Sequence, residues 1–280
     1  MISLSDRLRR RLSPRPCVSV IRLHGAIGLG GPLGRSLDDA SLAPVIERAF
    51  SPRRLKAVAL SINSPGGSPT QSALIAARIR RLAEEKKVKV HAFCEDVAAS
   101  GGYWLACAAD DIRADANAIV GSLGVISAGF GLQEAIKRLG VERRVRTAGA
   151  RKALLDPFRE ETPEDVARVE RLLKGIHANF IDHVKARRGE RLQGEDEALF
   201  SGEIWLAGEA ARLGLIDGVG HLVPTMKALY GDRARFHVAR PKKPLLRRLG
   251  GASAAELGAD LADGALAAVE ARAMRAQWGL

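Results

Sequence analysis

Aromatic residues and cysteine are both scarce in this chain of 280 residues. Phe, Trp and Tyr make up 4% of the sequence, so the hydrophobic core must rest on Ala, Leu, Val and Ile. The three cysteines are odd in number and form no CxxC pair, which argues against a disulfide framework. Two of them, Cys94 and Cys107, lie in apolar runs, where we expect buried free thiols and a reducing compartment.

Long hydrophobic runs are missing as well. The uncharged stretch 116–133 contains four glycines and two serines, a composition more typical of buried strand and turn than of a membrane span. Five arginines lie between residues 7 and 15, but no apolar segment follows them, which excludes a secretory signal peptide. We therefore expect a cytoplasmic protein without a transmembrane helix.

Several common site motifs are also absent. There is no Walker A sequence, and the glycine-rich segment 28–34 lacks the glycine at position 33 that a dinucleotide fingerprint needs. The six histidines are dispersed, without HExxH or another metal-ligand spacing, and Ser100 lacks the GxSxG elbow. The sequence therefore predicts no ATP, metal or organic cofactor.

Charge is plentiful and mostly positive. The net charge is +12, from 44 basic and 32 acidic residues, and it favours anionic partners without choosing among membrane, nucleic acid and acidic protein. Neither an RNP-like aromatic stripe nor a helix-turn-helix signature is present, so nucleic acid is not expected as a partner.

Strand-like and helix-like segments alternate from residue 17 onward. This alternation predicts an α/β domain with mainly parallel strands. Pro69 and Pro163 fit the first turns of two long helices. We expect a basic segment over 1–16, one domain over 17–239, and a basic linker with an Ala-rich helical tail over 240–280. The expected strands are 18–23, 55–62, 88–94, 112–114, 118–120, 125–127 and 141–147, and the expected helices are 37–50, 69–87, 100 onward, 132–139, 162–188, 207–213 and 221–230.

Ser100 and Lys152 are the candidate catalytic pair. Ser100 lies between small residues at the head of an expected helix, where its hydroxyl is unshielded and free backbone N–H groups lie beside it. No histidine has a triad context, so Lys152 is the candidate base, and Ser-Lys pairs are a known variant of the triad. The alternatives are a helix-capping serine and a solvated lysine on a loop.

Three further residues lie in small-residue motifs that suit this chemistry. The glycines of Ser64-Pro65-Gly66-Gly67 allow backbone N–H groups to approach a ligand, and the N–H of Gly101 follows the nucleophile directly. Ser122, in Gly121-Ser122-Leu123-Gly124, could hold the lysine amine by a hydrogen bond. Ordinary tight turns are the alternative explanation for both motifs.

Together these motifs resemble the signal peptide peptidase A (protease IV) family, within the crotonase/Clp-protease superfamily. The resemblance covers residues 18–223 and includes Asp156-Pro157-Phe158 after the lysine. It implies a spiral of ββα units with mainly parallel sheets followed by C-terminal helices. It also implies Ser100 as nucleophile, Lys152 as general base, Ser122 as the residue that orients the lysine, and the N–H groups of Gly67 and Gly101 as the oxyanion hole.

The expected function is thus a serine endopeptidase that cleaves extended peptides, such as signal-peptide remnants or unfolded segments. The resemblance further implies a homo-oligomer in which the serine and the lysine of one site come from adjacent subunits. Two alternatives stay open: a crotonase-like acyl-CoA enzyme, which would use acidic groups, and a non-catalytic basic scaffold.

The chain departs from the family pattern at its N-terminus, where most members of the family carry a membrane anchor. Leu4, Leu8 and Leu12 fall on one helical face with arginines around it, a pattern typical of a short interfacial helix on anionic lipid. A solvated terminus is the alternative, because a helix of about 12 residues is marginal in water. We expect at most a reversible, peripheral contact with the membrane.

Overall fold

The computed structural model describes residues 15–28, 37–149 and 151–240. Within these residues, eight strands form one sheet in the order β6-β5-β3-β2-β1-β8, with β4 beside β3 and β7 beside β4. Every pairing is parallel except that of β5 with β6, which confirms the expected α/β class. The strands are β1 (Cys17–His24), β2 (Leu55–Ser64), β3 (Lys89–Ala99), β4 (Asp111–Ala114), β5 (Ile119–Gly121), β6 (Ile204–Leu206), β7 (Gly218–Val219) and β8 (Arg235–Val238).

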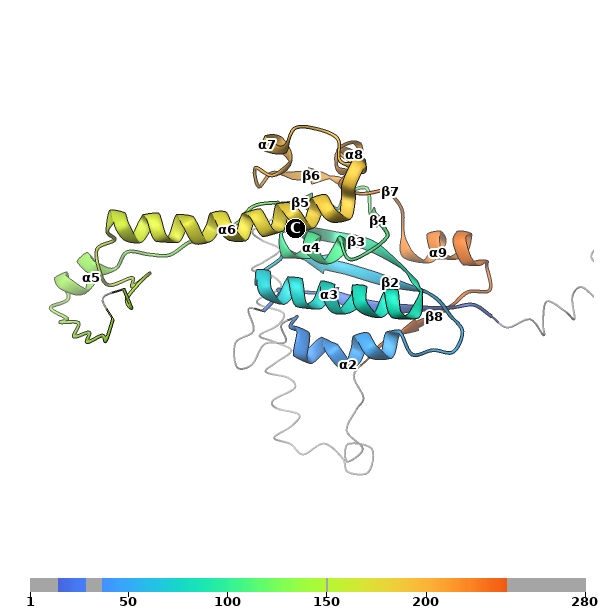
Figure 1. The fold of residues 1–280 in the computed structure, drawn as a ribbon, viewed down its shortest axis with the longest axis horizontal. Helices are drawn as coiled ribbons and strands as arrows, with labels where there is room; N and C mark the ends of the chain where they lie inside the picture. The colour runs from blue at the N-terminus through green and yellow to red at the C-terminus, as the bar shows by residue number, and fades with distance from the viewer. Residues whose placement is uncertain (1–14, 29–36, 150, 241–280) are drawn as a thin grey trace, which may run out of the picture.

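Helices cover both faces of the sheet (Figure 1). Along β2, Val58 and Leu60 face the larger core, which α2, α3, α4 and α6 close, while Ala57 and Ala59 face a smaller core beneath α9. This alternation follows from the two-residue period of a strand. The helices are α2 (Asp39–Ala49), α3 (Pro69–Lys86), α4 (Gly101–Ala106), α5 (Gln133–Arg138), α6 (Pro163–Arg188), the 3-10 turn η1 (Gly189–Arg191), α7 (Asp196–Leu199), α8 (Ala207–Arg212) and α9 (Leu222–Tyr230).

The long helices begin where the sequence predicts. Ser68 and Thr162 cap α3 and α6 by accepting hydrogen bonds from backbone N–H groups of the first turn. Each capping residue is followed by a proline, which needs no intrahelical acceptor at that position. Cys94 and Cys107 are buried free thiols, as expected, and burial raises the pKa of each to about 12.

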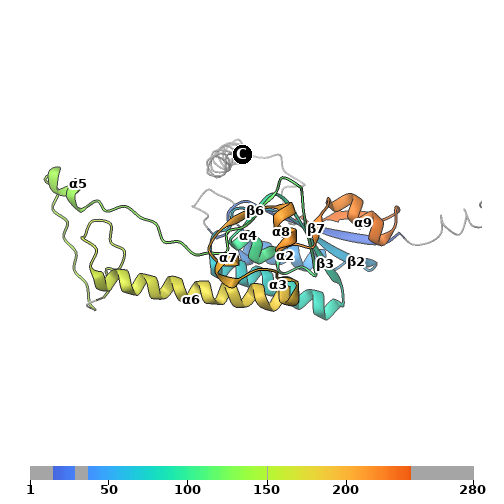
Figure 2. The ribbon, with the colours of Figure 1, turned by 90° about the horizontal axis from the view of Figure 1, so that it is seen from above.

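A slender extension projects from the globular part of the molecule (Figures 1 and 2). It consists of residues 125–162, including α5, together with the N-terminal half of α6, and is called the arm here. The rest of the described chain is called the body. Helix α6 joins the two, because Phe180 and Val184 lie in the main core and His177 bonds the Leu123 carbonyl at 2.9 Å.

Two strands expected in the arm do not form. Residues 125–127 and 141–147 are irregular, and neither pairs with another strand among the described residues. The β-branched residues Val141, Val145 and Thr147 favour a strand over 141–147, but a strand needs a neighbour to accept its backbone hydrogen bonds. Among the residues that the structure describes, the arm offers no such neighbour.

Candidate active site

Ser100 lies at the junction between the end of β3 and the start of α4. Its backbone has φ 53° and ψ −121°, a conformation that a residue with a side chain adopts only under constraint. The side chain makes no capping hydrogen bond to α4, so the helix-cap explanation for this serine is wrong. Every residue of α4 is buried, so packing against the core holds the turn in place. Ser100 itself is half-buried.

Glycines let a second turn pack directly against this serine. A Cβ atom on Gly66 would lie 2.8 Å from both the Ser100 Cβ and the Gly101 nitrogen. A Cβ atom on Gly102 would lie 2.4 Å from the Ser64 carbonyl oxygen. No side chain fits at either position, so close backbone approach explains the paired glycines of both motifs.

Gly67 belongs to the same turn and is held by Ile27. The Ile27 N–H donates to the Gly66 carbonyl at 2.9 Å, and the Ser68 N–H donates to the Ile27 carbonyl at 2.7 Å. The Gly67 N–H, which lies between these two bonds, has no acceptor among the described residues. The Gly101 N–H opens α4 and therefore has no intrahelical acceptor. The site thus gathers two unused backbone donors near one hydroxyl.

Ser122 lies beside Ser100 across the sheet. The Ser100 N–H donates to the Gly121 carbonyl at 2.8 Å, continuing the register in which Ala99 pairs with Gly121. Ser122 also has a positive φ, 54°, and its N–H donates to the Glu203 carbonyl at 2.7 Å. Two serines with constrained backbones therefore stand next to each other at the carboxyl edge of β3 and β5.

Lys152 is not part of this cluster. It is exposed in the loop between α5 and α6, and its N–H donates to the Gly149 carbonyl at 3.2 Å. That loop belongs to the arm, which Figures 1 and 2 both show extending away from α4. Within one chain, the structure brings together Ser100, Gly67, Gly101 and Ser122, and it leaves Lys152 apart.

The segment after Lys152 has a structural role that the sequence did not reveal. Asp156 forms an ion pair with Arg143 at 2.8 Å and accepts a bond from the Phe158 N–H at 3.0 Å. The Pro157 carbonyl accepts from the Leu132 N–H at 2.6 Å. These contacts tie the lysine loop to both flanks of α5.

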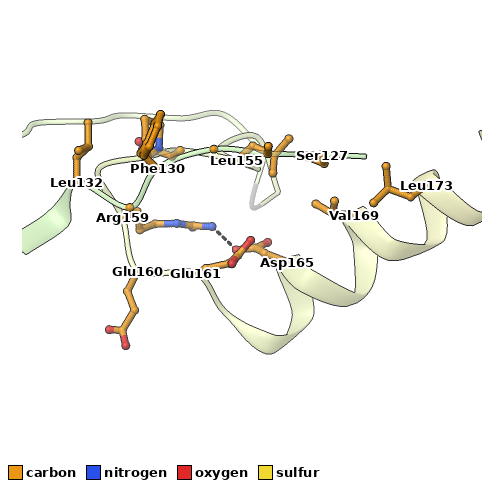
Figure 3. Close-up of a pocket in the computed structure, with 15 residues that line it drawn as sticks. Ser127, Phe130, Leu132, Leu155, Arg159, Glu160, Glu161, Asp165, Val169 and Leu173 are labelled. Atoms are coloured by element: carbon orange, nitrogen blue, oxygen red, sulfur yellow. Dashed lines mark hydrogen bonds and ion pairs between the residues drawn. The ribbon is translucent and has the colours of Figure 1, made fainter. Parts of the chain in front are cut away.

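A hollow of about 770 Å³ lies next to this loop, on the arm (Figure 3). Arg159 points across it to Asp165, a buried carboxylate in the first turn of α6 that also accepts from Arg168 at 2.9 Å. Phe130, on the rim, is 82% exposed. The hollow is therefore an open surface of the arm, spanned by an ion pair between an exposed arginine and a buried carboxylate.

Elsewhere on the sheet, a histidine contacts a serine, and the three groups there do not have the order of a catalytic triad. His24 Nε2 lies 2.7 Å from Ser61 Oγ, but the Ser61 hydroxyl donates directly to Glu95 at 2.6 Å. The same ring nitrogen of His24 also faces Glu95, at 3.6 Å. Because the carboxylate does not stand behind the imidazole, this group cannot activate its serine as a triad does.

The chain matches a known peptidase family over more than half its length. Residues 82–232 match the family described as Peptidase family S49. A protein of Synechocystis sp., provisionally named a protease, is 30% identical over 86% of this chain and 85% of its own length. The chloroplastic serine protease SPPA of Arabidopsis thaliana is 32% identical over 74% of this chain and 31% of its own length.

A further similarity involves a membrane transporter. A protein of Brucella melitensis named Na⁺/H⁺ antiporter NhaA is 48% identical over 98% of this chain. The chain spans only 39% of the length of that relative, and a Brucella abortus relative of the same name matches to the same extent. Among the described residues, every helix is too short or too polar to cross a bilayer.

Proposed function

Because the chain belongs to peptidase family S49, we propose that it is a serine endopeptidase acting on extended peptides through an acyl-enzyme at Ser100. The observation that carries this proposal is the backbone of Ser100, with φ 53° at a strand-to-helix turn. Strain of this kind persists only where the surrounding structure enforces it, and it exposes a nucleophile above its sheet. Membership of a peptidase family favours this function over an acyl-CoA enzyme or a basic scaffold.

The proposed reaction uses the groups gathered at α4. The Ser100 oxygen attacks the peptide carbonyl carbon as its proton passes to the neutral amine of Lys152. The N–H groups of Gly67 and Gly101 stabilise the oxyanion, a contribution of roughly 3–4 kcal/mol per donor in comparable sites. The protonated lysine then donates to the leaving amine, and water hydrolyses the ester with the lysine again acting as base.

We propose that Lys152 enters the site from a second copy of the chain. The arm exposes large apolar side chains that its own body does not cover, among them Ile126 and Phe130 at 82% and Leu139 at 77%. Apolar surface on this scale is typical of an interaction site. The unpaired segment 141–147 supplies backbone donors and acceptors that a neighbouring chain can satisfy. A homo-oligomer in which the arm of one copy reaches the Ser100 site of the next accounts for both features, and also for the separation of Lys152 from Ser100 within one chain.

We also propose a cytoplasmic location close to a membrane. The similarity to part of proteins named as Na⁺/H⁺ antiporters supports the membrane, and the free thiols support a reducing compartment. Signal-peptide remnants and unfolded segments are the peptide substrates we expect there.

A fluorophosphonate probe tests the proposed nucleophile. The probe should label the assembled wild-type protein, and digestion should map the label to Ser100. Ser100→Ala should abolish labelling, whereas Ser51→Ala should leave it unchanged, because Ser51 is an exposed serine whose hydroxyl only bonds the Glu47 carbonyl. Labelling of a different serine would contradict the proposal.

A further inference from the structure

A second hollow lies at the end of the sheet opposite Ser100. Ser100 follows the carboxyl end of β3, whereas this hollow, of about 650 Å³, lies where β1 and β2 begin. It is called the basic pocket here. It is lined by Arg15, Pro16, Arg53, Arg54, Leu55, Lys56, Leu229 and Tyr230.

The pocket concentrates positive charge without compensation. Four of its lining residues are cationic, none is acidic, and none of the four cations has a carboxylate partner among the described residues. The two acids that act electrostatically on Tyr230 are already engaged, since Asp110 pairs with Arg80 at 3.0 Å and Asp111 pairs with Arg113 at 3.1 Å. Like charges repel, so an anion that enters the pocket relieves this repulsion.

The walls of the basic pocket are part of the folded sheet. The Cys17 N–H donates to the Arg54 carbonyl at 3.1 Å, and the Arg235 N–H donates to the Pro16 carbonyl at 2.9 Å. Tyr230 is fixed from behind, because its hydroxyl lies 2.9 Å from a ring nitrogen of His91. The backbone that carries the cations is therefore held in place before any ligand binds.

One side of the pocket is apolar. Leu229, in the last turn of α9, is 55% exposed, and Tyr230 and Leu55 lie beside it. Exposed leucine and tyrosine next to arginine and lysine are typical of a surface that sits at a lipid headgroup layer. Residues 1–14, which lie outside the described part, add four arginines and join the domain at Arg15.

We propose that the basic pocket binds the phosphate group of an anionic phospholipid and docks the sheet edge opposite Ser100 onto a membrane. Arg53, Arg54 and Lys56 contact the phosphate, and Leu229 reaches the boundary of the acyl chains. The apolar wall favours a lipid over free phosphate or nucleic acid. Docked in this way, the chain presents its Ser100 edge away from the bilayer. The inference does not depend on peptidase activity.

Vesicle co-sedimentation of the full chain tests the pocket. The wild type should bind equimolar phosphatidylcholine and phosphatidylglycerol vesicles, more weakly at high salt, and should not bind phosphatidylcholine alone. The triple variant Arg53→Gln, Arg54→Gln, Lys56→Gln should bind the anionic vesicles about 100-fold more weakly, given the attraction of each cation to such a surface. Circular dichroism checks that each variant is folded.

A matched variant separates the pocket from total charge. Arg171→Gln, Lys174→Gln and Arg212→Gln remove the same charge from exposed positions on α6 and α8, outside the pocket. This variant should lose less than about tenfold. Equal losses in the two triple variants, or unchanged binding in the pocket variant, would overturn the proposal.

Three further measurements identify the source of the anion. Leu229→Ser should weaken vesicle binding several-fold, because only a lipid gives this side chain an apolar partner. Inorganic phosphate should not displace the protein from vesicles beyond the effect of chloride at equal ionic strength. A short single-stranded oligonucleotide should bind the wild type and the pocket variant alike. Displacement by phosphate, or a pocket-dependent oligonucleotide complex, would contradict a lipid ligand.

Discussion

The body buries most of its large apolar side chains, whereas the arm exposes many of its own to solvent. In the body, side chains such as Leu60, Ile62 and Tyr103 are fully or almost fully buried, and the Tyr103 hydroxyl donates to the Leu215 carbonyl at 2.6 Å. In the arm, Phe130 and Leu139 are largely exposed, and the contacts that give it shape are mostly ion pairs and backbone bonds. The body holds Ser100 with its donors, and the arm holds Lys152. The body is therefore complete as a fold, whereas the catalytic pair that we propose is complete only when the arm of one copy reaches the body of another.

The largest effect on activity is expected from substitution of Lys152, the member of the proposed catalytic pair that lies on the arm. Lys152→Ala should lower kcat/KM for a peptide substrate on the order of 10⁴-fold, as loss of a base does in related mechanisms. The melting temperature should not change, because Lys152 is exposed and has no ion pair among the described residues. Lys152→Arg should be equally inactive, since guanidinium does not lose its proton near neutral pH. An active arginine variant would rule out the lysine as base.

Substitutions in the body should lower the free energy of unfolding, in contrast to the substitutions of Lys152, which should lower activity alone. Arg188 is 2% exposed and donates to both oxygens of Asp217, at 2.9 and 3.1 Å. Asp217→Asn should destabilise the protein by about 3 kcal/mol, because it weakens a pair that keeps a buried guanidinium satisfied. Chemical denaturation measures this loss. A variant as stable as the wild type would show that the pair is dispensable to the body.

The same pair predicts an acid limit for the body. Burial alone would raise the pKa of Asp217, but the bonds from Arg188 and the Ile112 N–H outweigh burial and hold this pKa below its usual value. Because the folded pKa lies below the unfolded one, the stabilisation is present above about pH 4 and is lost as pH falls through the folded pKa. The melting temperature of the wild type should therefore drop with acid more steeply than that of Asp217→Asn. Parallel curves would contradict this role for Asp217.

Apolar surface of the arm should matter for assembly and not for the monomer fold. Phe130→Ser should shift the oligomer toward monomer about tenfold, because the loss of a buried aromatic contact costs more than 1 kcal/mol. Activity should fall most at low protein concentration. Leu74→Ser, at a 46% exposed leucine on α3 of the body, is the control and should leave assembly unchanged. Analytical ultracentrifugation distinguishes these results, and equal effects of both substitutions would remove the distinction between arm and body.

The smallest effect is expected at Ser122. Ser122→Ala should lower kcat by about tenfold with little change in KM, because the variant loses one hydrogen bond that positions the lysine amine. The fold should be unaffected, since Ser122 bonds the Glu203 carbonyl through its backbone N–H and not through its hydroxyl. A change confined to KM would place Ser122 in substrate binding instead.

Sequence reasoning succeeded where local chemistry determines the structure. The capping residues and prolines of α3 and α6 fix where these helices begin, whatever packs around them. The sequence predicted that the glycines of 64–67 allow backbone N–H groups to approach a ligand. It did not indicate that Gly66 packs against Ser100 or that Gly102 packs against the Ser64 carbonyl. The catalytic roles assigned to Ser100, Lys152, Ser122, Gly67 and Gly101 stay predictions.

Prediction from the sequence failed where a segment's structure depends on a partner that is distant in the sequence. The strands expected at 125–127 and 141–147 contain β-branched residues but have no neighbour to pair with in the part of the chain that the structure describes. Strands β6, β7 and β8 were missed, because these short segments follow the long helix α6 and form only where β5, β4 and β1 pair with them. The ion pair between Asp156 and Arg143 was also missed, because no local pattern links residues thirteen positions apart on an irregular loop. The expected Ala-rich tail over 240–280 and the N-terminal segment lie almost wholly outside the described residues.

A mixing experiment tests most directly whether the site is shared between a body and the arm of another copy. Ser100→Ala and Lys152→Ala are each expected to be inactive, and subunit exchange in an equal mixture should leave about one quarter of the sites with both wild-type groups. Peptide hydrolysis should therefore recover to about a quarter of the wild-type rate per copy, and only after exchange. No recovery despite exchange demonstrated by labelled subunits, or full activity in a wild-type monomer, would contradict the shared site.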